Sequence, residues 1–176
     1  FALPLYRILH FCVLFYSGGH TPISYLPIGE FISGFVMGGL IPMGCVAVAT
    51  GKWHFEVLIY ALPMIISIGL ILMSNNGCDI EKDIKANRKT LPVLIGRENT
   101  RKLYKTLTIV WMLLLWILPA FLIGIPYAIV CAAILHFAAR PAMLWLMRSP
   151  LTQEHRIEQM KTVLKANIMA KGAYIF

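Results

Sequence analysis

Four long apolar runs constrain the fold of this chain more than any other feature of its sequence. They cover residues 28–50, 57–74, 104–123 and 126–147. A helix that crosses a bilayer needs about 20 predominantly apolar residues, and each run is close to that length. Because backbone polar groups inside a bilayer must pair within their own segment, such runs predict helices. The sequence therefore predicts an all-α fold, a polytopic transmembrane helix bundle.

Two shorter apolar segments extend this pattern toward the ends of the chain. Residues 5–16 are typical of the later part of a further helix, although Arg7 and His10 interrupt it. Residues 163–176 are typical of the start of a last helix. We therefore expect a single transmembrane domain over residues 1–176, which is a fragment of a larger domain truncated at both ends.

Composition supports the membrane assignment and narrows the classes of function. Hydrophobic residues make up 59% of the chain and charged residues 14%, whereas soluble domains carry about 25% charged residues. The 16 basic residues exceed the 8 acidic ones, an excess that in membrane proteins marks cytoplasmic loops. No basic stripe with interleaved aromatic residues is present, so the bilayer and not nucleic acid is the expected partner. The four cysteines are too widely spaced for a disulfide framework or a metal cluster.

Basic residues are concentrated in two connecting segments and predict the orientation of the chain. One segment follows the second apolar run, and the other follows the fourth. The positive-inside rule places both in the cytoplasm. Residues 16–29 lie two crossings earlier and must share that side. The basic residues of the two segments are Lys82, Lys85, Arg88, Lys89, Arg97, Arg101 and Lys102, and then Arg148, Arg156, Lys161 and Lys165.

The first basic segment also holds paired acids, in the stretch SNNGCDIEKDIKANRKTLPVLIG over residues 74–96. Asp79 and Asp83 are four residues apart, which puts both carboxylates on one face of a helix. Two such charges repel each other unless a cation lies between them. Mg²⁺ prefers oxygen ligands and is typically held by one or two carboxylates together with substrate phosphates. The pair therefore predicts a metal–diphosphate site at the membrane surface.

Neighbouring residues fit the same kind of site. Asn75 and Asn76 end the preceding membrane helix, and Asn75 precedes Asp79 by four residues and so shares its face. Arg88 and Lys89 follow the acids and can neutralise a polyanion. We expect the asparagines and these two basic residues to contact substrate.

An ordinary solvated helix is the alternative interpretation of these charges. Asp79 can pair with Lys82, and Glu81 with Lys85, at helical spacings. Two features favour the binding site. The asparagines stand where a membrane helix usually ends in apolar or aromatic residues, and the charges lead directly into residues 90–96, an apolar segment too short to span a bilayer.

The stretch over residues 75–96 resembles the second aspartate-rich motif of the UbiA superfamily of membrane prenyltransferases. The most similar branch is that of the 1,4-dihydroxy-2-naphthoate polyprenyltransferases of menaquinone biosynthesis. YSGGHTPISYLPIGE resembles the loop before the fifth helix of the same branch. The matching positions are Asn75, Asn76, Asp79, Asp83, Thr90, Leu91 and Gly96 in the motif, and Tyr16, Pro22, Tyr25, Gly29 and Glu30 in the loop.

The chain departs from the pattern of that branch at three places. Cys78 stands where the branch has Arg, Asn87 replaces a Gly, and the basic pair has the order Arg88-Lys89. An altered residue beside Asp79 can change how the second substrate or the diphosphate is held. The first aspartate-rich motif of the superfamily has no counterpart before Asp79. The chain thus resembles roughly helices four to nine of nine, and we expect this fragment to be inactive alone.

The resemblance implies an intramembrane prenyltransferase that moves a polyprenyl group from an allylic diphosphate to 1,4-dihydroxy-2-naphthoate. It implies Mg²⁺ as the cofactor, with Asp79 and Asp83 as its ligands and as the catalytic residues. It also implies a bacterial inner membrane with the Asp79 loop in the cytoplasm. Substrate-binding roles fall on Asn75, Asn76, Arg88, Lys89, Tyr16, Tyr25 and Glu30, the last three because they lie on the same side as Asp79.

Three alternatives remain beside this interpretation. The acceptor can be another quinone ring or a haem. CDP-alcohol phosphotransferases also use two aspartates four residues apart, but they need a further Asp upstream, and no Asp precedes Asp79 here. A transporter with an acidic cytoplasmic site is the alternative of another class, although transporter acids tend to lie near the bilayer midplane.

Overall fold

A computed structural model describes residues 22–122 and 124–175, together with residues 7, 10, 11, 14–16 and 18. Residues 172–175 are described by their backbone alone. Every regular element in this part of the chain is helical, and no strand occurs there. The elements are η1 (Ile23–Tyr25), α2 (Gly29–Phe35), η2 (Val36–Leu40), α3 (Ile41–Thr50), α4 (Val57–Tyr60), α5 (Leu62–Cys78), α6 (Ile80–Lys85), α7 (Leu91–Leu122), α8 (Ile125–Ile134), η3 (Leu135–Ala139), α9 (Arg140–Arg148), η4 (Gln153–His155) and α10 (Arg156–Ile175).

Three helical stretches are long and apolar enough to cross a membrane: Gly29–Thr50, Leu91–Leu122 and Ile125–Arg148. The first and third each contain one turn of π-helix, at η2 and η3, and otherwise continue without a break. These stretches confirm the all-α polytopic membrane bundle that the apolar runs predict.

The run over residues 57–74 differs from a single helix. It is divided into α4 and α5 at Ala61, two residues before Pro63. Proline has no backbone N–H and a fixed φ, so it is favoured in the first turn of a helix and opposes a continuous helix through that point. α5 then continues past the predicted end to Cys78, which places both asparagines in its last turns.

Two helices begin earlier in the sequence than predicted. One is the helix expected to start at residue 163, and the other contains the apolar run over residues 104–123. α10 begins at Arg156 instead of residue 163. α7 begins at Leu91, with non-helical backbone at Gly96 (φ 77°), and continues through the charged residues that precede its apolar part. The ion pair between Lys102 and Glu98, 2.8 Å apart and one turn from each other, is typical of a solvated helix surface. The helix expected over residues 5–16 lies largely outside the described residues, and its described positions are helical.

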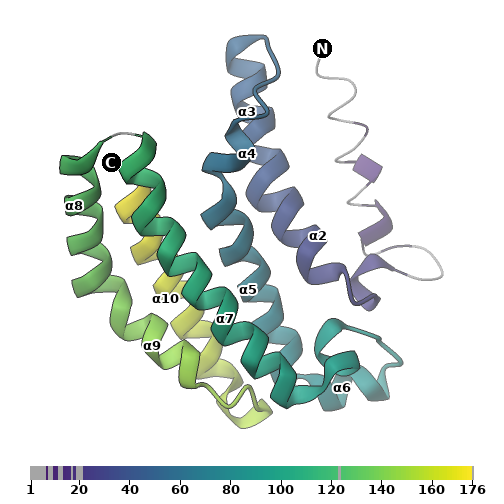
Figure 1. Ribbon diagram of the computed structural model, residues 1–176. Coiled ribbons are helices and arrows are strands. Elements are labelled where there is room, and N and C mark those ends of the chain that lie inside the picture. The colour runs from purple at the N-terminus through teal and green to yellow at the C-terminus, as the bar shows by residue number, and fades with distance from the viewer. Residues whose placement is uncertain are drawn as a thin grey trace.

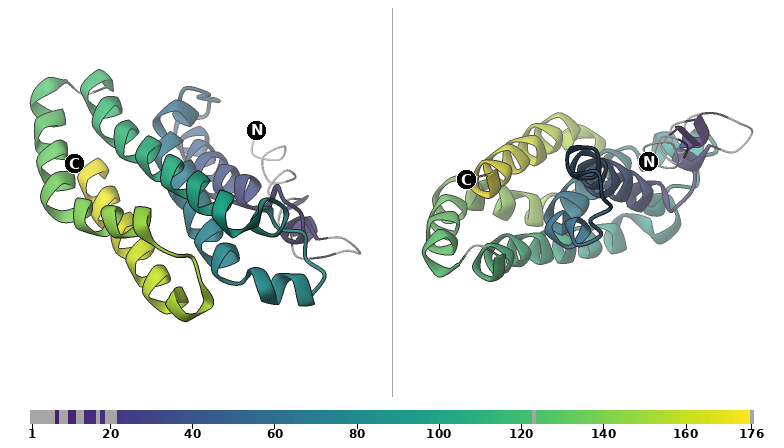
Figure 2. Two further views of the ribbon diagram at one scale, coloured as in Figure 1. Left: turned by 60° about the horizontal axis from the view of Figure 1, so that its bottom comes forward. Right: turned by 90° about the horizontal axis from the view of Figure 1, so that it is seen from above.

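α5 lies at the centre of the bundle and packs against α2, α7 and α10. Figures 1 and 2 show that α8 and α9 lie on the side of the bundle opposite α2 and α3, with α5, α7 and α10 between them. The core contains buried side chains from several helices. Among its fully buried members are Leu70 of α5, Tyr104 and Trp111 of α7, Met143 of α9 and Val163 of α10.

Glycines bring α2 and η2 close to α5. A Cβ atom added to Gly34 would lie 2.6 Å from the Ile65 carbonyl oxygen, and one added to Gly38 would lie 2.6 Å from the Ile65 backbone nitrogen. Small residues spaced four apart allow helix backbones to approach closely in this way. The contact places the beginning of α2 beside the last turns of α5.

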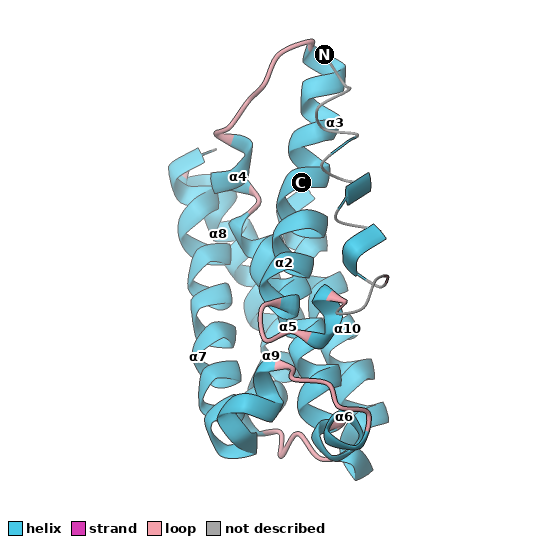
Figure 3. Ribbon diagram, turned by 90° about the vertical axis from the view of Figure 1, so that its right-hand side faces the viewer, coloured by secondary structure: helices cyan, strands magenta, loops and turns pink. Residues whose placement is uncertain are grey.

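Three segments far apart in the sequence meet at one end of the bundle (Figure 1). They are the segment that leads into α2, the α6 region, and the connection between α9 and α10. The opposite end holds the connection from α3 to α4, as the loops of Figure 3 show. This arrangement matches the shared side that the charge pattern predicts for the three segments.

Candidate functional site

Asp79 lies between α5 and α6, where the chain turns at the end of the central helix. Its side chain is only 13% exposed and lies between two cations. Lys82 Nζ is 3.2 Å from Asp79 Oδ1, and Arg156 Nε is 2.7 Å from Asp79 Oδ2. The pairing with Lys82 confirms one of the two helical pairs expected from spacing. The contact with Arg156 joins α10 to the acidic loop.

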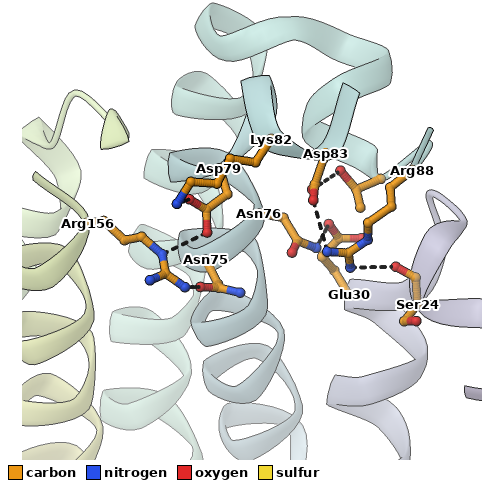
Figure 4. Close-up of polar contacts among 10 residues, drawn as sticks. Ser24, Glu30, Asn75, Asn76, Asp79, Lys82, Asp83, Arg88 and Arg156 are labelled. Carbon is orange, nitrogen blue, oxygen red and sulfur yellow. Dashed lines mark hydrogen bonds and ion pairs between the residues drawn. The ribbon is translucent and has the colours of Figure 1, made fainter. Parts of the chain in front are cut away.

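Asn75 shares the face of Asp79, as the four-residue spacing predicts. Arg156 Nη2 donates a hydrogen bond of 2.7 Å to Asn75 Oδ1. One guanidinium therefore contacts both residues (Figure 4). Hydrogen bonds between a charged donor and an oxygen are stronger than neutral ones, so this contact holds the last turn of α5 against the first turn of α10.

Asp83 lies on α6 and is 3% exposed. Arg88 Nη1 donates to Asp83 Oδ1 at 2.9 Å, and Thr90 Oγ1 donates to Asp83 Oδ2 at 3.1 Å. A buried carboxylate is costly unless it is paired and hydrogen-bonded, and here each oxygen has a partner. Asp83 thereby holds the loop between α6 and α7 against α6.

Arg88 also joins the α6 region to the segment before α2. Its Nη2 donates to the Ser24 carbonyl oxygen at 3.1 Å, and its guanidinium carbon lies 5.0 Å from the centre of the Tyr25 ring. The backbone N–H of Lys89 donates to the Tyr25 carbonyl oxygen at 2.8 Å, while the Lys89 side chain is exposed. The structure thus brings Tyr25, Arg88 and the backbone of Lys89 together.

Asn76 points away from Asn75 and toward α2. Its Nδ2 donates to Glu30 Oε1 at 2.8 Å, and both side chains are 3% exposed. Glu30 Oε2 has no hydrogen-bond partner among the residues that the structure describes. Tyr16 is half-buried near Ser33, Glu30 and Arg88. Glu30 and Tyr16 therefore lie on the Asp83 side of the site.

The two aspartates are held by different cations. Asp79 precedes α6 with φ −107° and ψ 20°, outside the helical region, whereas Asp83 lies within α6. Figure 4 shows Asp79 directed toward Arg156 and Asp83 directed toward Arg88, with Asn76 between them. Among the described residues, no three His, Cys, Asp or Glu side chains gather as a metal centre. Any metal here needs ligands besides the two aspartates.

Glu81 does not pair with Lys85, which was the partner expected from helical spacing. Arg97 Nη1 and Nη2 donate to the two Glu81 carboxylate oxygens at 2.8 and 2.9 Å, and Arg97 Nε donates to the Leu151 carbonyl oxygen at 2.9 Å. The hydrogen bonds from Arg97 lower the pKa of the Glu81 carboxyl. α6 has only six residues, so a cation on the next helix can reach Glu81 with better geometry than its own neighbours.

A buried polar layer lies one turn below the site. Gln159 Nε2 of α10 donates to Ser74 Oγ at 2.9 Å, and Ser74 Oγ donates to the Tyr104 hydroxyl at 2.8 Å. All three side chains are at most 1% exposed. Because each belongs to a different helix, the layer aligns α5, α7 and α10 directly beneath Asp79.

Sequence reasoning assigned no role to Arg156 or Thr90. Arg156 is separated from Asn75 by 81 residues, and no local spacing relates the two. The charge pattern placed both on one side of the membrane, which was the one available signal. Thr90 matches a position of the motif, but the sequence does not indicate that its hydroxyl donates a hydrogen bond to Asp83.

The fold and the site together define a class of protein. It is an integral membrane protein built from helices, with two largely buried carboxylates at one end. An arginine contacts each carboxylate, and one pair of asparagines precedes both acids in the sequence. The chain belongs to the UbiA prenyltransferase family, whose model it matches over residues 2–163.

Curated relatives agree with this family. The chain is 40% identical over 83 residues to the 1,4-dihydroxy-2-naphthoate octaprenyltransferase of Bacillus subtilis (strain 168), a match that covers 47% of this chain and 27% of that protein. It is 38% identical over 103 residues to the UbiA prenyltransferase domain-containing protein 1 of Mus musculus, with 58% and 30% covered. The corresponding protein of Gallus gallus is 24% identical over an alignment of 191 residues. That alignment covers all of this chain and 53% of the relative. The chain thus spans between about a quarter and about half of these relatives.

Proposed function

We propose that the protein carrying this chain transfers a polyprenyl group from an allylic diphosphate to 1,4-dihydroxy-2-naphthoate, with Mg²⁺ as cofactor. The observation that carries this proposal is the pair of aspartates, Asp79 at the end of α5 and Asp83 in α6, in contact with cations from α6, the connection from α6 to α7, and α10. Membership of a prenyltransferase family supports the reaction class. The Bacillus subtilis relative, named for this acceptor, supports the choice of acceptor.

The charges of the site suit a diphosphate. Lys82, Arg88 and Arg156 contact the two carboxylates of Asp79 and Asp83, and the exposed Lys89 follows Arg88. With the buried acid Glu30 nearby, four basic residues meet three acids, and this excess of basic residues attracts a polyanion. Arginine is suited to this role because its planar donors match phosphate oxygens.

The donor set also fits Mg²⁺. Asp79 and Asp83 present carboxylate oxygens, which magnesium prefers, and two carboxylates complemented by substrate phosphates form a common magnesium site. These two residues would hold the ion. When bound, it would supply charge neutralisation for the departing diphosphate.

Residues of the chain would bind the substrates and stabilise the carbocation. Arg88 and Lys89 bind the diphosphate, and Asn75 and Asn76 shape the pocket beneath it. Ionisation of the allylic carbon–oxygen bond gives a carbocation, which a carbon of the naphthoate ring attacks with loss of carbon dioxide. Aromatic faces stabilise a nearby cation, and we assign this role to Tyr16 and Tyr25. Glu30, with one carboxylate oxygen available, would contact the acceptor.

The alternatives are less well supported by the position of the acids. Asp79 lies beyond the last turn of α5 and not in the middle of a membrane-spanning helix, which disfavours a transporter with a midplane ion site. A different quinone or a haem as acceptor would use the same diphosphate site. For the location of the protein, we propose the bacterial inner membrane with α6 in the cytoplasm.

Substitution of the two aspartates tests this proposal. In the full-length protein, we expect Asp79→Asn and Asp83→Asn each to lower Mg²⁺-dependent prenyl transfer by at least about a hundredfold, because a lost metal ligand costs several kcal/mol. Transfer is measured with radiolabelled polyprenyl diphosphate and 1,4-dihydroxy-2-naphthoate in proteoliposomes.

Glu81→Gln is the matched control, because Glu81 is an acid of the same short helix whose side chain is 54% exposed. It should retain most of the activity. If both aspartate variants stay within about tenfold of the unmodified protein, the metal-binding role is wrong. If the diphosphate is consumed only with another acceptor, the reaction class stands and the acceptor is wrong.

A further inference from the structure

The first residue of α10 contributes a cation to the site from the far end of the chain. Arg156 Nη2 donates to Asn75 Oδ1, and Arg156 Nε lies against Asp79 Oδ2, both at 2.7 Å. Asn75 and Asp79 are one helical turn apart, so a single guanidinium reaches two residues of the site.

The position of Arg156 is fixed by buried hydrogen bonds one turn further along α10. Gln159 follows it by three residues on the same helix, is fully buried, and donates to Ser74 Oγ. Ser74 in turn donates to the Tyr104 hydroxyl. This layer holds α10 in register with α5, so the guanidinium is placed by packing of the helix and not only by its own flexible stem.

The Arg156 guanidinium also has N–H donors left over for a further ligand. Its side chain is 40% exposed, whereas that of Asp79 is 13% exposed. A guanidinium has five N–H donors on three nitrogens. The hydrogen bond of Arg156 to Asn75 uses Nη2, and Nε forms the ion pair with Asp79 without a hydrogen bond. An anion that approaches Asp79 from solvent therefore meets the exposed part of this group.

We propose that Arg156 is a diphosphate-binding residue of the site. In the free protein it is held by Asn75 and Asp79, and when the substrate binds it donates to the diphosphate oxygens. This inference rests on the proposed function, since it assigns a further residue to the same substrate. A purely structural link between α5 and α10 would instead affect folding without changing the affinity for diphosphate.

Direct binding distinguishes these two roles. The probe is a polyprenyl S-thiolodiphosphate, in which sulfur replaces the bridging oxygen, titrated with Mg²⁺ into the full-length protein in nanodiscs by calorimetry. We expect Arg156→Ala to raise the Kd by about tenfold or more, because it removes a charge-assisted contact. Lys161→Ala, on the same helix and exposed, should leave the Kd unchanged.

Each outcome supports or contradicts the assignment. A Kd for Arg156→Ala within about twofold of the unmodified protein, with thermal unfolding showing a folded variant, overturns it. If Arg156→Ala does not fold, Arg156→Gln replaces it, since its amide keeps a donor near Asn75 without the charge. An unchanged Kd in that variant overturns the assignment equally. If the unmodified protein does not bind the probe, the proposed function itself is wrong.

Discussion

The two adjacent asparagines of α5 serve opposite sides of the site. Asn75 accepts a hydrogen bond from Arg156, and Asn76 donates one to Glu30. Asn76 is thus the described partner of a buried carboxylate that begins the first long apolar helix. A buried acid without such a donor would be strongly destabilising.

Replacement of Asn76 tests this dependence. We expect Asn76→Ala to lower the stability of the protein by about 1–3 kcal/mol, because it leaves a buried carboxylate oxygen without its donor. Thermal unfolding in detergent measures the change. Asn99→Ala is the control, since Asn99 is exposed and its Nδ2 donates only to the Ile95 carbonyl oxygen of its own helix. Equal unfolding temperatures for the two variants would contradict the role of Asn76.

Local spacing predicted some residue contacts and missed others for a physical reason. Asn75 shares a face with Asp79, and Lys82 pairs with Asp79, because both relations are set by the geometry of one helical turn. Glu81 pairs with Arg97 and not with Lys85, because its partner belongs to another helix. Contacts between elements depend on how helices pack, which no spacing within one element records.

At the scale of elements, α2 and η2 approach α5 closely, backbone to backbone. A Cβ at Gly38 would lie 2.6 Å from the Ile65 nitrogen and 2.7 Å from its Cα. These are backbone atoms, so they cannot rotate away as a side chain would. The helical stretch that carries Gly34 and Gly38 must therefore move away from α5 if either glycine gains a side chain.

We expect Gly38→Ala to destabilise the protein by about 1–3 kcal/mol through overpacking. It should also lower prenyl transfer, because the same helical stretch carries Glu30. Unfolding temperature and activity are measured together. Gly69→Ala is the control on the other helix, where the nearest atom to an added Cβ is the Glu30 carbonyl oxygen at 3.5 Å. A Gly38 variant as stable as the Gly69 variant would show that the helices can separate at no cost.

The sequence predicted the apolar parts of the helices well and their polar ends poorly. The three membrane-spanning stretches fall where the apolar runs lie, because the hydrocarbon layer selects for that composition. The start of α7 was missed because residues 91–95 are a short apolar stretch that ends at Gly96 and is followed by the charge-rich residues 97–102. The first turns of α10 were missed because they are rich in charge. The π-helical turns at η2 and η3 had no recognisable sequence signal.

At the scale of the whole molecule, the charged segments gather at one end of the bundle, so a single orientation would put them all on one side of a membrane. Lys85 lies in α6 at that end, and Lys52 lies in the connection from α3 to α4 at the other end (Figure 3). Both are exposed. They therefore form a matched pair of reporters for the two sides of the membrane.

We expect a cysteine at Lys52 to react with a membrane-impermeant maleimide in intact cells, and one at Lys85 to react only after the cells are opened. Introduced thiols are read in a variant in which all four native cysteines are replaced by serine, since Cys45 is exposed. The reverse pattern would show that the positive-inside rule fails for this protein.

The contact between Arg156 and Asn75 also bears on the order in which the site is made. Synthesis proceeds from the N-terminus, so α5 and both aspartates are made well before α10. Until then, Asp79 has Lys82 beside it but lacks the guanidinium. If Arg156 binds the diphosphate as proposed, a chain translated only as far as α9 would therefore lack one of the cations of the site.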